Sequence, residues 1–144
     1  MTTVKEVLRT KGHDIWSVRS DASVFDALKL MAEKNVGAVL VIDGEDLVGI
    51  MSERDYARKV ILKGKMSKST LVRDIMTERV VCVRTDQTLE ECMALMTDKR
   101  IRHLPVIEGG RLVGVISIGD VVRAMIADQQ FTITQLENFI TGRR

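Results

Sequence analysis

Apolar positions along the chain follow two spacings, which together predict a regular order of strands and helices. A short alternating run at 15–18 comes first, and the apolar residues of 24–31 then recur every three or four positions. Two apolar runs follow at 38–42 and 47–51, separated by a short turn that contains glycine. Alternation and short apolar runs are typical of strands, whereas three-and-four spacing is typical of amphipathic helices. The pattern therefore predicts a strand, a helix, two strands joined by a tight turn, and a second helix.

The same order of elements occurs twice, because the chain resembles itself at an offset of 65 residues. The stretch 112–120 has the skeleton of 47–55, and the register holds without a gap between residues 18 and 60. Identical pairs at this offset include Val18/Val83, Asp21/Asp86, Leu30/Leu95, Met31/Met96, Val41/Val106, Gly49/Gly114, Ser52/Ser117, Asp55/Asp120 and Arg58/Arg123. We therefore expect two β-α-β-β-α repeats, at 1–70 and 71–130, in a mixed α/β (α+β) fold.

The size of each repeat bears on how the two are arranged. A unit of this length does not readily cover both faces of a three-stranded sheet, so we expect the two repeats to pack against each other with pseudo-twofold symmetry. A short amphipathic turn or helix is also expected at 3–9, with an echo at 72–76.

The tail at 131–144 is expected to form a separate short amphipathic helix. Thr134 and Glu137 have the spacing of a capping box, and Gly142 is suited to end a helix. The apolar stripe on this segment consists of Leu136, Phe139 and Ile140. The sequence leaves open whether this stripe packs onto its own domain or onto a second copy or another partner.

Composition narrows the classes of protein to consider. The chain has 144 residues, 45% of them hydrophobic, which is enough for one compact body with a real core. A net charge of +2 and only 3% aromatic residues give no support to nucleic-acid binding. The apolar runs fall far short of the ~20 residues that a membrane helix needs, and the N-terminus lacks a signal-peptide pattern. We therefore expect a cytoplasmic protein without a membrane partner.

Cysteine and histidine usage gives no sign of a metal or disulfide framework. Cys82 and Cys92 are the only cysteines, and they form no Cys-x-x-Cys motif. Cys82 falls in a predicted strand and Cys92 on the apolar side of a predicted helix, so both are expected in the core. No metal site is expected.

A Ser-x-x-Asp motif lies twice at a point where a strand becomes a helix. Ser52 and Asp55 form the first copy, and Ser117 and Asp120 form the second. A helix start offers free N–H groups and the positive end of the helix dipole, which favour an anion such as a phosphate. The same residues also suit an ordinary helix cap, in which the serine is the N-cap and the aspartate a first-turn acid. Both interpretations remain open from the motif alone.

The doubled Gly-h-h-Ser-x-x-Asp pattern, together with the stretch Arg102-His103-Leu104-Pro105-Val106, resembles a tandem pair of cystathionine β-synthase (CBS) domains, also called a Bateman module. The resemblance covers roughly residues 4–126, as in small stand-alone bacterial members of the family. It implies binding of AMP, ADP or ATP, and in some members NAD(H) or S-adenosylmethionine, in clefts between the repeats. It also implies disc-like homodimers, and no metal is required.

The resemblance further implies roles for the four residues of the two motifs. Asp55 and Asp120 would accept hydrogen bonds from the ribose hydroxyls, and Ser52 and Ser117 would reach the phosphate or the ribose. This role suits an ionised carboxylate, because it is an acceptor only and takes both hydroxyls of a cis-diol.

Other residues are implied for the phosphate and the adenine. Arg102 and His103 match the family position that faces phosphate, where a fork-shaped guanidinium is well suited. The apolar residues implied beside the adenine are Ala38, Val39 and Leu104. The first repeat lacks the Arg-His pair and the proline, so the two clefts are expected to differ in affinity.

Two classes of function follow from these observations. The leading expectation is a non-enzymatic, nucleotide-responsive module that regulates another protein. The alternative is an interaction scaffold whose clefts have lost their ligands. An enzyme is not expected, because the chain has no phosphate-binding Gly-x-x-x-x-Gly-Lys loop, no Gly-x-Gly-x-x-Gly fingerprint and no nucleophile pattern, and no catalytic residue is assigned.

Overall fold

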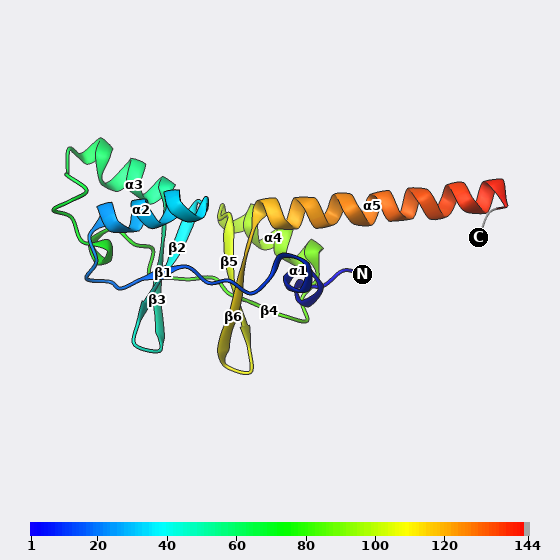
Figure 1. Cartoon of the computed structure of the whole chain (residues 1–144), viewed down its shortest axis with the longest axis horizontal. Coiled ribbons are helices and arrows are strands. Elements are labelled where there is room, and N and C mark those ends of the chain that lie inside the picture. The colour runs from blue at the N-terminus through cyan, green and yellow to red at the C-terminus, as the bar shows by residue number, and fades with distance from the viewer. Residues whose placement is uncertain (143–144) are drawn as a thin grey trace. The chain divides into compact units, whose positions relative to one another are not determined.

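The computed structural model describes residues 1–142 and contains two compact units (Figure 1). The first-repeat unit comprises residues 14–81, and the second-repeat unit comprises residues 1–13 together with the chain from residue 82 onward. Each unit contains one three-stranded sheet and its own helices. The predicted mixed α/β fold with two β-α-β-β-α repeats is confirmed.

The sheet of the first-repeat unit has the strand order β1-β2-β3. β1 and β2 are parallel, and β2 and β3 form an antiparallel hairpin. The elements are β1 (Ser17–Val18), α2 (Val24–Lys34), β2 (Ala38–Asp43), β3 (Asp46–Ser52), α3 (Glu53–Lys59) and the 3₁₀ turns η1 (Ile61–Lys63) and η2 (Val72–Asp74). α2 supplies the long crossover that a parallel pair of strands requires.

The second-repeat unit has the same topology, with the strand order β4-β5-β6. Its elements are α1 (Val4–Lys11), β4 (Val83–Arg84), α4 (Leu89–Lys99), β5 (His103–Glu108), β6 (Arg111–Ser117) and α5 (Ile118–Thr141). The two hairpins share a register irregularity, which lies between Val41 and Ile42 in one and between Val106 and Ile107 in the other. The duplication therefore extends to the detail of the backbone.

Amphipathic spacing explains the core of the first-repeat unit. α2 buries Val24, Ala27 and Met31, which recur every three or four positions. The residues that share one buried cluster with them are Val39, Val41, Met51, Val60, Val72 and Ile75. One face of α2 is thus covered by the hairpin and by the segments that follow it.

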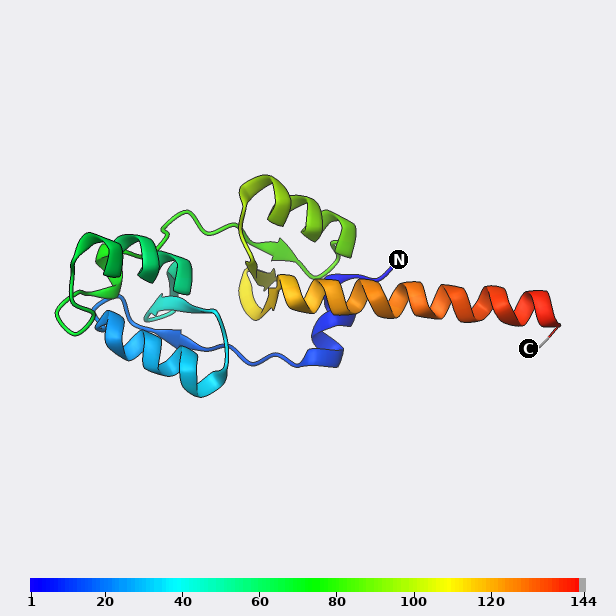
Figure 2. The same cartoon turned by 90° about the horizontal axis from the view of Figure 1, so that it is seen from above.

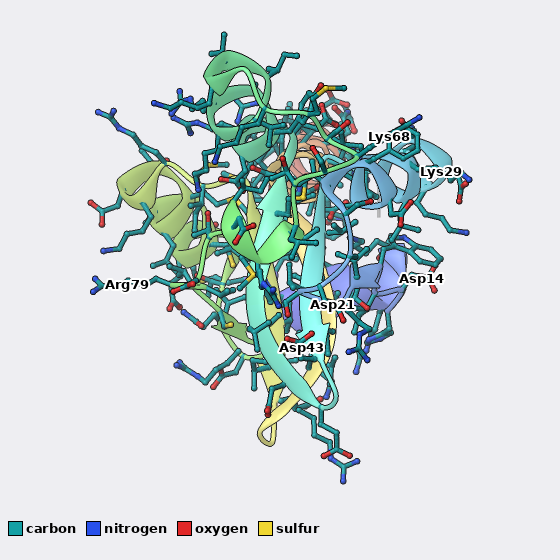
Figure 3. All side chains as sticks on the ribbon, turned by 90° about the vertical axis from the view of Figure 1, so that its left-hand side faces the viewer. Asp14, Asp21, Lys29, Asp43, Lys68 and Arg79 are labelled. Carbon is teal, nitrogen blue, oxygen red and sulfur yellow. The ribbon has the colours of Figure 1, made fainter. Side chains whose placement is uncertain are left out.

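The loop between β1 and α2 is tied to the hairpin of the same unit. Asp43, at the end of β2, accepts a hydrogen bond from the backbone amide of Ser20 at 2.9 Å, and Asp21 lies in the same loop (Figure 3). The hydroxyl and the amide of Ser20 lower the pKa of Asp43 below its ordinary value. An ionised carboxylate therefore fastens this loop to the hairpin turn.

The N-terminal segment packs on the second-repeat unit and not on the repeat that follows it in the sequence. The amide of Val4 donates to the carbonyl of Gln87 at 2.8 Å, and the amide of Lys5 donates to the carbonyl of Thr85 at 3.0 Å. Leu8 of α1 is fully buried and lies against Gly114 of β6. The helix expected at 3–9 is present as α1, and it completes the unit that begins at residue 82.

The segment between the two repeats has the corresponding place in the first-repeat unit. The amide of Val72 in η2 donates to the carbonyl of Ala22 at 2.8 Å, and Thr77 pairs with Ile50 of β3. The expected echo of the N-terminal helix is therefore a shorter 3₁₀ turn. The sequence repeats at 1–70 and 71–130 describe the duplication, whereas the compact units take their packing segments across those boundaries.

The prediction of a separate tail helix is wrong, because α5 is one continuous helix from Ile118 to Thr141. The Thr134 hydroxyl does not cap a new helix and donates instead to the carbonyl of Gln130 within α5 at 3.0 Å. Gly142 does end the helix, as expected, with a positive φ of 71°. Figures 1 and 2 show the second half of α5 extending beyond α1, α4 and the sheet of its own unit.

The contact between α1 and β6 predicts a large effect of Gly114→Ala on stability. A Cβ at Gly114 would lie 2.8 Å from Cδ2 and 3.2 Å from Cδ1 of Leu8, which is fully buried. We expect overpacking to lower the free energy of unfolding by about 1–3 kcal/mol, measured by urea denaturation.

Gly119→Ala is the matched control for this substitution. Its Cβ would meet only the flexible end of Arg123 within 3.4 Å, and alanine in a helix is favoured over glycine by up to ~1 kcal/mol. We expect this variant to be as stable as the wild type or more stable. Equal losses in the two variants would contradict the proposed packing of α1 against Gly114.

Candidate functional site

The structure brings four predicted residues of the second repeat to one end of the β5–β6 hairpin. β5 begins at His103 and β6 ends at Ser117, and these two residues are paired in the sheet. The amide of Ile118, the first residue of α5, donates to the carbonyl of Arg102 at 2.8 Å. Asp120 follows in the first turn of α5. Together, Arg102, His103, Ser117 and Asp120 are called the second-repeat site below.

Ser117 and Asp120 form a complete capping box at the start of α5. The hydroxyl of Ser117 accepts a hydrogen bond from the amide of Asp120 at 3.2 Å, and the amide of Ser117 donates to Oδ2 of Asp120 at 2.8 Å. The capping interpretation of the motif is therefore confirmed. The amides of Ser117, Ile118 and Asp120 all donate within the protein, so this helix start offers an anion few free N–H groups.

The carboxylate of Asp120 lies between two cationic side chains. Nζ of Lys11, the last residue of α1, is 2.7 Å from Oδ2, and Nη2 of Arg123 is 2.7 Å from Oδ1. Asp120 is only 8% exposed, and Lys11 also donates to the carbonyl of Val115 at 2.6 Å. These three side chains, Lys11, Asp120 and Arg123, form the Asp120 cluster.

The electrostatics of this cluster keep Asp120 ionised. Burial raises the pKa of Asp120, but the hydrogen bond from Lys11 and those from Ser117 outweigh it, so the pKa lies below its ordinary value. At neutral pH the side chain is a hydrogen-bond acceptor only. Such a group suits the hydroxyls of a sugar.

Sequence analysis missed both cations of the Asp120 cluster. Arg123 follows Asp120 by three residues, a spacing that places the two on one face of a helix, so this pair was open to discovery from the sequence. Lys11 is 109 residues away from Asp120 and lies outside the second repeat, and no sequence pattern connects the two.

Ser52 and Asp55 form the first-repeat site, which has the same capping box as the second-repeat site but different cationic side chains. The amide of Ser52 donates to Oδ2 of Asp55 at 3.0 Å, and the hydroxyl of Ser52 accepts from the amide of Asp55 at 3.1 Å. Oδ1 of Asp55 lies 3.0 Å from Nζ of Lys59 in the next turn of α3 and accepts from the hydroxyl of Thr77 at 3.4 Å. These partners of Asp55 all belong to the first-repeat unit.

The residues implied for adenine and phosphate differ in accessibility. The side chains of Val39 and Leu104 are fully buried, and Val39 belongs to the core of the first-repeat unit. Ala38 is half-buried and pairs with Ser52 in the β2–β3 hairpin. Arg102 is exposed. Val39 and Leu104 therefore have only backbone edges to offer a ligand, whereas the side chain of Arg102 is accessible to solvent.

His103 is held in its neutral form by its surroundings. The side chain is half-buried, and burial is the main cause that lowers its pKa below the ordinary value. The charges of Lys11 and Arg102 lower it further, while Asp120 opposes them. At neutral pH the imidazole therefore offers one hydrogen-bond donor and one acceptor in place of a positive charge.

A cavity of about 450 Å³ lies beside Asp120, between α1 and α5 of the second-repeat unit. Its apolar lining includes Val7, Ala124 and Ala127, and its polar lining includes the Asp120 cluster at one end. This volume falls within the usual range for small-molecule pockets.

One of the two cysteines lies where it was expected and the other does not. Cys92 is fully buried in α4, as predicted, and burial, with Glu91 nearby, raises the pKa of its thiol to about 11. The prediction for Cys82 is wrong, because this residue is exposed and precedes β4.

Between residues 1 and 142 no group of three or more His, Cys, Asp and Glu side chains is placed to hold a metal ion. Over the same residues no helix is both long and apolar enough for a membrane crossing.

Comparison with known proteins places these features in a family context. The sequence model of the family described as CBS domain matches residues 3–62 and 72–127. The mitochondrial CBS domain-containing protein CBSX3 of Arabidopsis thaliana is 42% identical over 151 residues, covering 98% of this chain and 73% of that protein. A solved protein with CBS domains from Burkholderia ambifaria MC40-6, whose name places it in signal transduction, is 56% identical with a TM-score of 0.86. The match covers 92% of this chain and 99% of that one.

A third similar structure contains ligands. The CBS domain pair of protein MJ0100 was solved in complex with 5′-methylthioadenosine and S-adenosyl-L-methionine. It is 25% identical to this chain, with a TM-score of 0.78, and the match covers 89% of this chain and 98% of that one. Both ligands of that protein contain an adenosine group.

The lowered pKa of His103 predicts how stability depends on pH. The unfolded chain titrates this histidine near its ordinary value of about 6.5 and the folded protein below it, so the unfolded state binds more protons in that interval. The contribution of neutral His103 to the free energy of unfolding is therefore complete above pH ~6.5. It is lost as the pH falls toward the pKa of His103 in the folded protein. We expect the free energy of unfolding, measured with urea between pH 7 and pH 5, to fall less steeply in His103→Gln than in the wild type. An identical pH dependence in both proteins would count against the buried, neutral imidazole.

Proposed function

This chain belongs to the CBS domain family, and we propose that it is a regulatory module that binds adenosine-containing ligands at its two Ser-x-x-Asp sites. AMP, ADP and ATP are the first candidates, followed by NAD(H). Binding takes place without consumption of the ligand, and its consequence is a change in how the module acts on a partner protein. We also propose that the module works as a homodimer.

The observation that carries the proposal is the ionised carboxylate of Asp120 at the end of the β5–β6 hairpin. A carboxylate has about four lone-pair directions, and Ser117, Lys11 and Arg123 occupy three of them. The side chains of Arg123 and Lys11 are 73% and 32% exposed, so both have room to move aside. A ribose diol would then take the place of one or both cations.

Once a ribose has displaced Lys11 and Arg123 from Asp120, these two side chains become available to bind a phosphate. A phosphate beside the ribose needs positive charge, and Lys11, Arg123 and the exposed Arg102 all lie around the second-repeat site. Because three amides of the helix start are already bonded, side-chain cations are the better source of phosphate recognition here. The first-repeat site has Lys59 beside Asp55 but no counterpart of Arg102 or His103, since Gly37 and Ala38 stand at those positions. We therefore propose that the second-repeat site binds nucleotides more tightly.

The backbone edges beside Ala38, Val39 and Leu104 are proposed to recognise adenine. Two of these side chains are buried in the core, so the polar groups that they present are main-chain N–H and C=O. Main-chain groups at fixed positions match one pattern of donors and acceptors, which makes such a site selective between purines.

A ligand-free scaffold is the second candidate function, and one observation favours it. Asp55 and Asp120 are both partnered within the protein, so the two capping boxes are complete without a nucleotide. A thermal-shift assay with AMP, ATP and NADH separates the two functions, because a ligand that binds only the folded state raises the melting temperature. A scaffold without ligand sites would show no shift with any of the three.

Substitution of Asp120 tests the proposed site directly. Asp120→Asn removes the charge and one acceptor, so we expect the affinity for AMP or ATP to fall by ~10- to 150-fold, equivalent to about 1.5–3 kcal/mol. Because Asp120 also holds Lys11 and Arg123, we expect the variant to lose about 1–3 kcal/mol of stability as well. Calorimetric titration measures the affinity, and urea denaturation measures the stability.

Two further variants make this test specific. Asp86→Asn removes an exposed carboxylate that pairs with Arg84 on the surface, and it should leave nucleotide affinity unchanged. Asp55→Asn should reduce the tighter binding step less than Asp120→Asn does. If Asp120→Asn bound nucleotides as tightly as the wild type, the proposed site would be wrong and the Ser117 and Asp120 motif would serve only as a helix cap.

Purine selectivity tests the proposed recognition of adenine. The 2-amino and 6-oxo groups of guanine would meet main-chain groups of the wrong polarity, which costs about 1–3 kcal/mol. We therefore expect AMP to bind at least ~5-fold more tightly than GMP in calorimetry. Equal affinities would contradict recognition of the base by main-chain edges.

A further inference from the structure

The second half of α5 presents an uncovered row of aliphatic side chains. Ile126, Ile133, Leu136 and Ile140 are 58%, 47%, 57% and 80% exposed, and the row begins with Val122 nearer the body of the unit. In Figures 1 and 2 this half of the helix extends beyond the other elements of its own unit. The row lies along a single helix and not in a pocket.

The spacing of the row is that of a coiled-coil seam. Counting Gln129 as one polar member, the positions are Val122, Ile126, Gln129, Ile133, Leu136 and Ile140. From Ile126 to Ile140 the intervals alternate between three and four residues, which averages to one position of the row every 3.5 residues. A sustained 3.5-residue repeat fits the same repeat on another helix, and it fits neither a flat sheet nor an irregular groove.

The composition of this half shows that the helix depends on a covering partner. Seven of the eleven residues from Phe131 to Thr141 are β-branched or aromatic, and these types have only moderate helix propensity. Glu137 is the only charged residue between 129 and 141, so this stretch has no salt bridges between successive turns to stabilise a helix in water. Burial of the apolar row is the remaining source of helix stability.

We infer that this row, here called the α5 seam, pairs with the α5 seam of a second copy of the chain. Isoleucine occupies one set of seam positions, at 126, 133 and 140, and leucine lies in the other set at 136, a combination that favours two-stranded pairing. Identical seams on two copies are self-complementary about a twofold axis. The near absence of charge between 129 and 141 also removes like-charge repulsion between the copies.

Off the seam, α5 exposes Phe131 and Phe139, at 66% and 84%, together with polar side chains that are satisfied within the helix. The hydroxyls of Thr132, Thr134 and Thr141 lie off the seam and donate to carbonyls within α5, so they need no external partner. Gln129 is the one polar residue in the seam, and a buried polar residue at such a position reduces stability while it restricts the register. The pairing gives the proposed homodimer an interface, and it uses none of the residues of the two Ser-x-x-Asp sites.

Sedimentation equilibrium of the full chain at tens of micromolar tests the pairing. We expect the wild type to be a dimer and both Ile133→Asp and Ile140→Asp to raise the dissociation constant at least ~100-fold, because each places a charge against its own copy. Gln129→Leu should lower the dissociation constant. A monomeric wild type would overturn the inference, and so would an aspartate variant with the dimer affinity of the wild type.

Phe131→Asp is the matched control. Phe131 is 66% exposed and lies only two residues from Ile133, but those two residues turn it about 200° around the helix. We expect this variant to keep the dimer affinity of the wild type, and equal weakening by Phe131→Asp and Ile133→Asp would overturn the seam. Unfolding by urea reports whether the compact units of each variant stay intact. Retained AMP binding in monomeric Ile133→Asp would show that nucleotide binding does not require the dimer.

Discussion

The capped and paired carboxylate of Asp120 is the interaction on which the second-repeat unit depends. It completes the cap of α5 through Ser117, and it holds α1 to the unit through Lys11 at 2.7 Å. Leu8 of the same helix α1 is buried against Gly114 of β6, so α1 is attached to the unit by a polar contact with α5 and by an apolar contact with β6. Removal of one partner from a buried, ionised group of this kind is costly, because the remaining charge is left without compensation.

The duplicated fold gives two sites that are alike in their caps and different in their cations. Asp55 is held by Lys59 and Thr77 from its own unit, whereas Asp120 is held by a residue from the far end of the chain. On the proposed function, a ribose that competes for Asp120 weakens the tie between α1 and the rest of the unit. A ligand at Asp55 would disturb only local contacts. A ligand at Asp120 would therefore affect the attachment of α1, whereas a ligand at Asp55 would affect contacts within the first-repeat unit.

Periodicity and internal repetition predicted most of the fold, and their failures have physical causes. The offset of 65 residues gave both β-α-β-β-α units, and the capping-box spacing located both helix starts, because these signals are local. The Thr134 to Glu137 spacing was misleading, since no glycine or proline between Asp120 and Gly142 interrupts α5 and a capping residue inside a helix simply bonds backward. Lys11 was missed because its contact with Asp120 is produced by tertiary packing over 109 residues.

The central claim is that the capping-box carboxylates contact the ligand, and carbon-13 NMR of the aspartate side-chain carboxylates during a titration with AMP tests it most directly. The signals of Asp120 and Asp55 are identified by their absence in the asparagine variants, and the exposed Asp86 serves as the internal reference. The account predicts that the Asp120 signal moves first, that the Asp55 signal moves at higher AMP concentration, and that the Asp86 signal stays in place. Saturable binding of AMP with neither the Asp120 nor the Asp55 signal moving would contradict it.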